Sequence, residues 1–193
     1  MLIPVKSSAG THLVPVESKL FEKRIIFLEG EINHESANEF LKQLMQLTLE
    51  DPNEKIRVFI NSPGGVIDAG LSIYDALQGS TVPIELYNVG RAYSMAAVIL
   101  LSGQQGRYIL PNAKVMLHEP LIHTCPGGNA SSMKSLSDSL QQERSKLNAI
   151  IAKHTGMSIK AVNKATSYDH FYSAQEAVDA NLCDVIVSMA ELL

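Results

Sequence analysis

Three side chains that could together perform nucleophilic catalysis lie far apart in this sequence. The first, Ser94, stands between a predicted strand and a predicted apolar helix, with small residues on both sides. Its hydroxyl would there lie near free backbone N–H groups and the positive end of a helix dipole, which stabilise an oxyanion. A serine at such a position also commonly caps the helix, so the local pattern alone leaves both roles open.

His118 and Asp169 are the candidate partners of that serine. His118 follows an apolar strand, and the ends of parallel strands are where groups that contact a ligand converge. A neutral imidazole is the usual base for a serine. Asp169 lies in Tyr168-Asp-His-Phe171, where it could orient a histidine and stabilise its cation. Taken singly, His118 could be a polar residue at the sheet edge, and Asp169 a turn residue.

Two glycines follow a predicted strand in Asn61-Ser-Pro-Gly-Gly65. Their backbone N–H groups could face a bound carbonyl without a Cβ in the way. A plain turn is the alternative. A phosphate-binding loop is disfavoured, because neither GxGxxG nor GxxxxGK[ST] is present.

A metal site is a further possibility, formed by His118, His123 and Cys125. Their spacing matches no zinc motif, and Pro120 disfavours a helix between them. The segment around Cys125 contains proline and glycine, which makes it a poor platform for a nucleophile. We therefore expect no metal site and no bound cofactor.

Alternating strands and helices must bring these residues together. Short β-rich runs follow one another along the first two thirds of the chain, separated by helices with helical apolar spacing. This alternation predicts an α/β fold with a parallel sheet and right-handed crossovers. The predicted elements are strand 24–28, a helix from Asn33 to about 51, strand 56–60, helix 67–79, strand 84–89, helix 95–101, and strands 107–110 and 114–117.

The two ends of the chain differ from this pattern. Residues 1–20 contain Pro4, Gly10 and Pro15, and are predicted to form a loosely ordered arm. A long polar helix is predicted over about 130–154, followed by two short helices and a final strand at 184–187. The long helix has a narrow apolar stripe, which predicts that this helix projects from the subunit and packs on a partner rather than within the subunit. The stripe consists of Met133, Leu136, Leu140, Leu147, Ile150 and Ile151.

The composition limits the class of protein. The chain has 193 residues, a net charge of −4 and two cysteines, with 46% hydrophobic and 19% charged residues. These values indicate one ordered domain, or one domain with a small appendage, and they exclude a disulfide scaffold. They disfavour nucleic acid or an anionic membrane as the main partner. We expect a cytoplasmic protein, because no apolar run reaches about 18 residues and the start lacks the order of a signal peptide.

Taken together, these segments resemble the Clp protease proteolytic subunit family of serine peptidases, from about Leu20 to Val187. The order and spacing of the matching stretches are specific to that family. The stretches are Lys23-Arg-Ile-Ile-Phe-Leu, Ile60-Asn-Ser-Pro-Gly-Gly-Val-Ile, Ala69-Gly-Leu-Ser-Ile-Tyr-Asp, Ala92-Tyr-Ser-Met, Leu110-Pro-Asn-Ala-Lys-Val-Met-Leu-His, His154-Thr-Gly and Ser173-Ala-Gln-Glu-Ala-Val.

The resemblance implies a role for each candidate residue. Ser94 would be the nucleophile, His118 the general base and Asp169 the orienting acid of a serine endopeptidase, with the backbone N–H groups of Gly65 and Met95 as the oxyanion hole. The implied fold is a crotonase-like α/β spiral of βαβ units with a protruding handle helix, here about 130–154. Residues 20–193 would form one catalytic domain, and residues 1–19 an arm at the axial pore.

The resemblance also implies an assembly. Two stacked seven-membered rings would enclose the active sites, and an AAA+ Clp ATPase would unfold protein substrates, dock near Phe59 and feed the chains in. The rings would contain this chain alone or this chain mixed with a second paralogue. Hydrolysis in the ring would need no cofactor.

Several positions depart from the family pattern and indicate a divergent paralogue. Arg91-Ala-Tyr-Ser-Met95 replaces Gln-Ala-Ala-Ser-Met, Glu119 follows the histidine in place of glutamine, and Tyr168 and Arg57 replace a common arginine and a common aromatic residue. The first alternative is a catalytically silent or regulatory ring subunit, which the intact Ser94, His118 and Asp169 disfavour. A phage-type prohead protease and a crotonase-fold acyl-CoA enzyme are the others.

Overall fold

A seven-stranded, mostly parallel sheet forms the centre of the computed structural model, which describes residues 1–7, 10–122 and 127–192. The path β3-β4-β5-β6-β9 is parallel throughout, β7 pairs with β5 in parallel, and β8 pairs antiparallel with β7. The strands are β3 (Ile25–Ile32), β4 (Ile56–Gly65), β5 (Ile84–Tyr93), β6 (Arg107–Ile109), β7 (Lys114–Leu117), β8 (His170–Tyr172) and β9 (Val185–Ile186).

Strand β5 divides its edge between two partners. Its first half, Leu86 to Asn88, pairs with β6, whereas its end, Arg91 to Tyr93, pairs with β7. The sheet therefore turns along β5, and β7 and β8 continue it beside the point where β5 ends. This turn is what brings the second half of the chain to the carboxyl end of β5.

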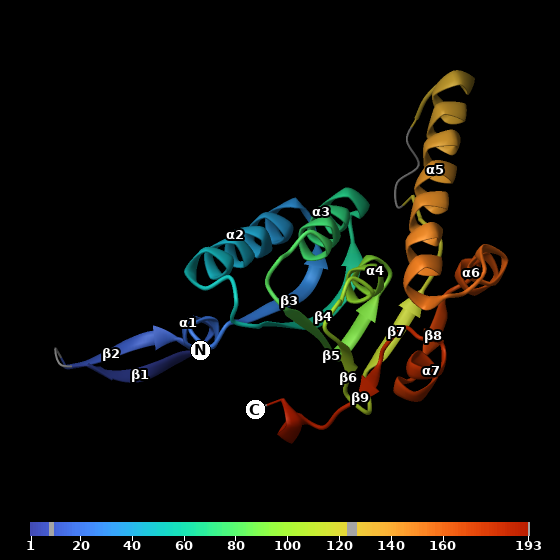
Figure 1. Cartoon of the computed structure of the whole chain (residues 1–193). Coiled ribbons are helices and arrows are strands. Elements are labelled where there is room, and N and C mark those ends of the chain that lie inside the picture. The colour runs from blue at the N-terminus through green and yellow to red at the C-terminus, as the bar shows by residue number, and fades with distance from the viewer. Residues whose placement is uncertain (8–9, 123–126, 193) are drawn as a thin grey trace.

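Three helices cover one face of the sheet (Figure 1): α2 (His34–Glu50), α3 (Ile67–Gln78) and α4 (Met95–Leu100). The predicted start of α2 is confirmed, because the Asn33 side chain accepts from the Ser36 N–H at 2.9 Å while the Ser36 hydroxyl accepts from the Asn33 N–H at 3.0 Å. Such a capping box satisfies backbone donors that the first helical turn leaves unpaired.

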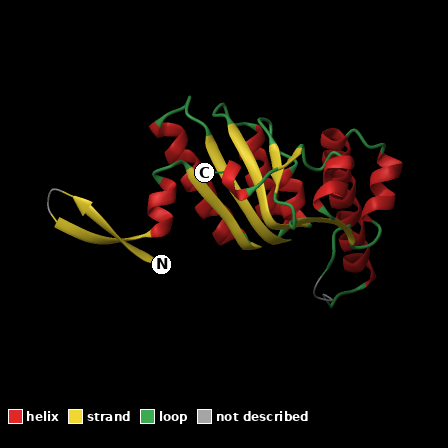
Figure 2. Ribbon diagram, turned by 90° about the horizontal axis from the view of Figure 1, so that it is seen from below, coloured by secondary structure: helices red, strands yellow, loops and turns green. Residues whose placement is uncertain are grey.

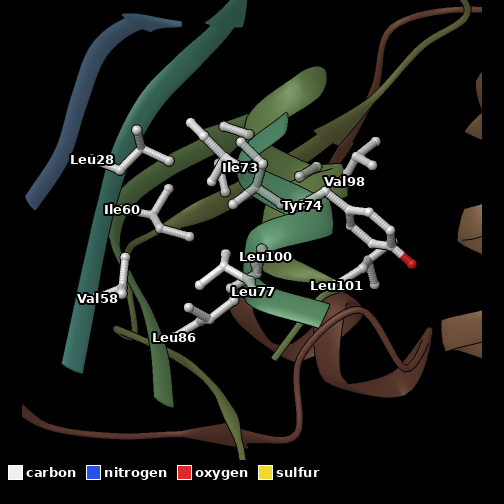
Figure 3. Packing of buried hydrophobic residues seen from close by; sticks show 14 of the residues in the cluster. Leu28, Val58, Ile60, Ile73, Tyr74, Leu77, Leu86, Val98, Leu100 and Leu101 are labelled. Carbon is white, nitrogen blue, oxygen red and sulfur yellow. The ribbon is translucent and has the colours of Figure 1, made fainter. Parts of the chain in front are cut away.

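The main core lies between these helices and the sheet (Figure 3). Leu28, Val58, Ile60 and Leu86 project from adjacent strands toward side chains such as Ile73 of α3. Each fully buried leucine or isoleucine contributes about 1.5–3 kcal/mol relative to an exposed one. Because successive side chains of a strand point to opposite faces of the sheet, these residues place the main core on the face that carries the helices.

Aromatic rings form a row across the opposite face of the sheet. Phe27, Phe59, Tyr87 and Tyr108 stack in that order, with ring centroids 5.3, 5.1 and 4.7 Å apart. Val187 and Leu192 pack with the central rings, so the C-terminal segment covers part of this face. The Arg57 guanidinium holds that segment by donating to the Leu192 carbonyl at 2.6 Å.

The predicted long helix is present as α5 (Ala130–Thr155) and projects from the body of the molecule (Figure 1). The Asn129 side chain caps its first turn, and Gly156, at φ 76°, ends it in the left-handed conformation that glycine adopts readily. Two short helices follow, α6 (Ile159–Thr166) and α7 (Ala174–Asp179). The role of α5 as a handle between rings remains a prediction.

The N-terminal segment is more ordered than predicted. Strands β1 (Leu2–Ser7) and β2 (Gly10–Pro15) form an antiparallel hairpin that extends away from the body (Figure 2), and α1 (Val16–Phe21) joins it to β3. Pro4 and Pro15 suggested irregular structure, but in a two-stranded ribbon each strand has a free edge, where proline is tolerated. The boundary between this arm and the catalytic domain stays a prediction.

Across residues 1–7, 10–122 and 127–192, none of the helices has both the length and the apolar composition that crossing a bilayer requires.

Candidate active site

Ser94 stands at a sharp turn between β5 and α4. Its backbone has φ 54° and ψ −121°, a conformation that residues other than glycine seldom adopt. The Ser94 N–H donates to the Met116 carbonyl of β7 at 2.9 Å, which fixes the turn against the neighbouring strand. Its side chain makes no capping hydrogen bond to α4. Of the two roles that the local sequence leaves open, capping is therefore not what this hydroxyl does here.

Two glycines let the end of β4 approach its neighbours closely: Gly64 faces the Ser94 turn, and Gly65 faces the end of β3. A Cβ at Gly64 would lie 2.8 Å from the Ser94 Cβ and 2.9 Å from the Met95 nitrogen. A Cβ at Gly65 would lie 2.1 Å from the Ile32 carbonyl oxygen. Neither position has room for a side chain, and both have positive φ, 91° and 152°. The structure thus places the segments that carry the Gly65 and Met95 N–H groups side by side.

The pairing of β7 with β8 brings His118 and Asp169 together. Leu117 pairs with His170 in this antiparallel ladder, so the next residue on each strand, His118 and Asp169, continues the same register. The Glu119 N–H donates to the Thr166 carbonyl at 2.7 Å and holds the segment just beyond the histidine. Sequence separation is large, but the strand register makes the two side chains neighbours.

His118 contacts both other candidate residues. Its Nε2 lies 2.7 Å from the Ser94 Oγ, and its Nδ1 lies 3.2 Å from the Asp169 Oδ1. With its proton on Nδ1, the imidazole donates to the carboxylate and accepts the serine O–H. The His118 side chain is 16% exposed and the Asp169 side chain 61%. Water therefore screens the carboxylate charge more than it screens the imidazole.

A cleft of about 480 Å³ opens over Ser94 and His118. Its floor is apolar and combines side chains of α4, β7 and α5, whereas the end of β3 contributes a carboxylate. The residues that line it include Glu31, Val98, Leu117, Leu147 and Ile151. An apolar cleft with few polar groups is typical of a site that binds and orients a ligand.

Sequence reasoning missed Glu31 and misplaced Leu147 and Ile151. It assigned the whole apolar stripe of the long helix to contact with a partner, but Leu147 and Ile151 are 7% and 3% exposed and pack within the main core of this subunit. That part of the prediction is wrong, because apolar periodicity gives the buried face of a helix without naming what covers it. No local signal marked Glu31, which reaches the cleft only through β3–β4 pairing.

Phe59 does not belong to this cleft. Its ring lies on the opposite face of the sheet, between Phe27 and Tyr87, and is 7% exposed in this subunit. Its predicted role in docking a partner remains a prediction.

The metal alternative concerned His123 and Cys125, which lie outside the described residues. Among the residues that the structure describes, no three His, Cys, Asp or Glu side chains converge as metal ligands would. Burial raises the pKa of the Cys183 thiol to about 12, so this cysteine is not poised to act as a nucleophile.

Comparison with protein families agrees with this fold. Residues 8–190 match the sequence model of the Clp protease family, which is nearly the whole chain. The mostly parallel sheet, with its helices and the turn along β5, is consistent with the crotonase-like fold of these peptidases. The chain belongs to the Clp protease family.

Proposed function

We propose that this chain is a serine endopeptidase that hydrolyses peptide bonds of unfolded proteins. Membership of the Clp protease family supports a Clp-type peptidase. The observation that carries the catalytic assignment is the position of His118, 2.7 Å from the Ser94 hydroxyl and 3.2 Å from the Asp169 carboxylate. In this assignment Ser94 is the nucleophile, His118 the general base and Asp169 the group that orients the imidazole.

The reaction would proceed in two transfers. In the first, the Ser94 Oγ attacks the scissile carbonyl carbon while the His118 Nε2 takes its proton; the imidazolium then returns that proton to the leaving amine, and an acyl-serine ester remains. In the second, water attacks the ester, His118 again accepts and returns the proton, and the serine is released with a carboxylic acid product. Asp169 stabilises the imidazolium in both transfers.

The negative oxygen of each tetrahedral intermediate needs hydrogen-bond donors. We assign this role to the backbone N–H groups of Gly65 and Met95. The Met95 N–H is the first of α4, and the first N–H groups of a helix have no acceptor within it. The close approach of Gly64 to Met95 supports the pairing of the two segments.

The proposed assembly encloses these sites in stacked rings, with α5 as the handle between them and the arm of residues 1–19 near the axial pore. The projection of α5 from the body of the subunit supports this role (Figure 1). A folded domain is stable by about 5–15 kcal/mol and exposes little extended chain. Degradation of folded proteins would therefore require an AAA+ ATPase, docked near Phe59, whereas short peptides would not.

The decisive experiment combines kinetics with an active-site label. Ser94→Ala should lower kcat for a short fluorogenic peptide by at least ~10³, His118→Ala by a similar factor, and the double variant by little more, because nucleophile and base act as one unit. A fluorophosphonate should label the unaltered protein and not Ser94→Ala.

The matched control is Ser139→Ala, an exposed serine on α5 whose loss should leave turnover and labelling unchanged. Turnover by Ser94→Ala near that of the unaltered protein would reject the assignment. Absence of both turnover and labelling in the unaltered protein would instead favour the catalytically silent ring subunit.

A further inference from the structure

Glu31 is the one carboxylate among the described residues that line the cleft over Ser94 and His118. It lies near the end of β3, which is an edge strand of the sheet. Gly30, at φ 71°, and a register shift between Glu29 and Glu31 interrupt the strand at this point. Glu29 and Glu31 consequently lie on different surfaces of the subunit. Glu31 lines the cleft, whereas Glu29 lines a groove between β3 and α2.

The strand pairing sets the distance from Glu31 to the proposed nucleophile, Ser94. Glu31 pairs with Gly64 on β4, and paired strands are about 4.8 Å apart. Gly64 in turn touches Ser94, since a Cβ on it would lie 2.8 Å from the serine Cβ. Glu31 is thus about two strand spacings, roughly 10 Å, from the nucleophile. An extended peptide rises about 3.3 Å per residue, so this carboxylate would meet a residue about two or three positions from the scissile bond.

The charge of Glu31 has no partner within the described part of the subunit. Its carboxylate makes no hydrogen bond or ion pair there, and no lysine or arginine lines the cleft. Glu119, the residue after His118, differs, because the Arg144 Nε lies 3.0 Å from its Oε2. A substrate side chain that enters this end of the cleft therefore meets one uncompensated negative charge beside an apolar floor.

We infer that Glu31 determines part of the substrate specificity, by favouring peptides with a lysine or arginine side chain two or three residues from the scissile bond. This inference rests on the proposed peptidase function and adds a substrate class to it. The same carboxylate disfavours acidic side chains at that subsite. Because Glu31 is exposed to water, an ion pair with it is expected to change kcat/KM by roughly two- to fivefold rather than by orders of magnitude.

The test uses N-acetylated, internally quenched peptides with one cleavable site. Lysine, glutamine or glutamate replaces one residue at a time, at each of the three positions on either side of the scissile bond. We expect the lysine peptide to exceed the glutamine peptide by roughly two- to fivefold at one or two of these positions. The ratio should fall to about one in Glu31→Gln and below one in Glu31→Lys, and 0.5 M NaCl should reduce it in the unaltered protein.

Glu29→Gln is the matched control, because it removes the same charge from the same strand outside the cleft. It should keep the lysine preference. A preference that survives Glu31→Gln, or that Glu29→Gln abolishes equally, would overturn the inference. So would a lysine preference that is absent from the N-acetylated peptides and appears only in the same peptides without the acetyl group, since the cation recognised would then be the terminus. Equal cleavage of all peptides overturns this inference alone, whereas cleavage of none overturns the proposed function.

Discussion

The two ends of α5 share one apolar stripe but differ in what covers it. At the end nearest Gly156, Leu147 and Ile151 are buried in the main core and form part of the cleft floor. In the outer half, Leu136 and Leu140 are only half-buried and Met133 is 44% exposed. That half extends away from the body of the molecule (Figure 1).

The difference shows that one periodic pattern can serve two purposes. The second half of α5 is stabilised by its own subunit: Leu147 and Ile151 form part of the cleft floor, and the Arg144 Nε lies 3.0 Å from the Glu119 Oε2. The outer turns carry apolar side chains that this subunit covers less completely. Apolar side chains that recur at spacings of three and four on one side of a helix are typical of packing between helices. The comparison can be tested by changing residues at each end.

The largest effect is expected from Leu140→Asp in the outer half of α5. If this half packs between rings, the substitution places an unpaired charge in the interface between the rings in every subunit. Each copy should then lose several kcal/mol of association free energy. Double rings should separate into single rings of low activity, which light scattering would detect. The free energy of unfolding of the subunit itself should change little.

Ser139→Asp introduces the same charge one residue earlier, at an exposed position, and serves as the control. It should leave the assembly intact. An unaltered double ring in Leu140→Asp would reject the handle role of α5.

The two faces of the sheet also differ in how completely the subunit covers them. The face under α2 and α3 is covered by long elements, whereas the aromatic row on the other face is covered by the short C-terminal segment. Phe59 was predicted to anchor a partner, yet within the subunit its ring already has neighbours on both sides. Phe27, at the end of the row, is 42% exposed.

The second prediction therefore distinguishes two roles of Phe59: packing within its own subunit and docking of an ATPase partner. Phe59→Ala should lower the free energy of unfolding by about 3–5 kcal/mol, because it empties a buried aromatic site. Phe59→Leu fills most of that volume and should cost less. The docking role predicts that Phe59→Leu loses degradation of a folded, tagged protein with unfoldase and ATP, while it retains cleavage of a short peptide. Phe27→Leu is the control for the exposed end of the row.

Equal loss in both assays would show that Phe59 is a core residue only. No loss in either assay would place the docking site elsewhere.

Local sequence patterns were sufficient for much of the fold. The capping signal at Asn33, the short β-rich runs of β3 and β4, and the long helix near 130–154 agree with the structure, because each depends on residues close together in the chain. The hairpin of residues 2–15 was missed, since its prolines are signals of irregular structure that an edge strand can accommodate.

The site was harder to predict, for a physical reason. Ser94, His118 and Asp169 are each ambiguous in local sequence, and only their matching order in a known family selected them. Their contacts depend on the β5–β7 and β7–β8 pairings, which are long-range. Glu31 reaches the cleft through a third such pairing, and no pattern near it in the sequence indicates that position.

The smallest effect is expected at the packed end of α5, where His154 contacts Tyr74 of α3. The two groups are 2.8 Å apart, and the Tyr74 hydroxyl can donate to the neutral His154 Nε2. Burial, and then the nearby Lys153 and Arg107, lower the pKa of His154 below its ordinary value. The unfolded chain therefore binds a proton at this residue more readily than the folded chain does.

It follows that the free energy of unfolding should be greatest above the ordinary histidine pKa, near 6.5, and should fall as the pH is lowered through that value. Urea unfolding at pH 7.5 and 5.0, at one protein concentration, would measure this fall. His154→Gln should make the fall smaller, because the titrating group is gone, whereas His12→Gln in the exposed hairpin should leave it unchanged. An identical fall in His154→Gln would show that the contact between α5 and α3 does not depend on the neutral imidazole.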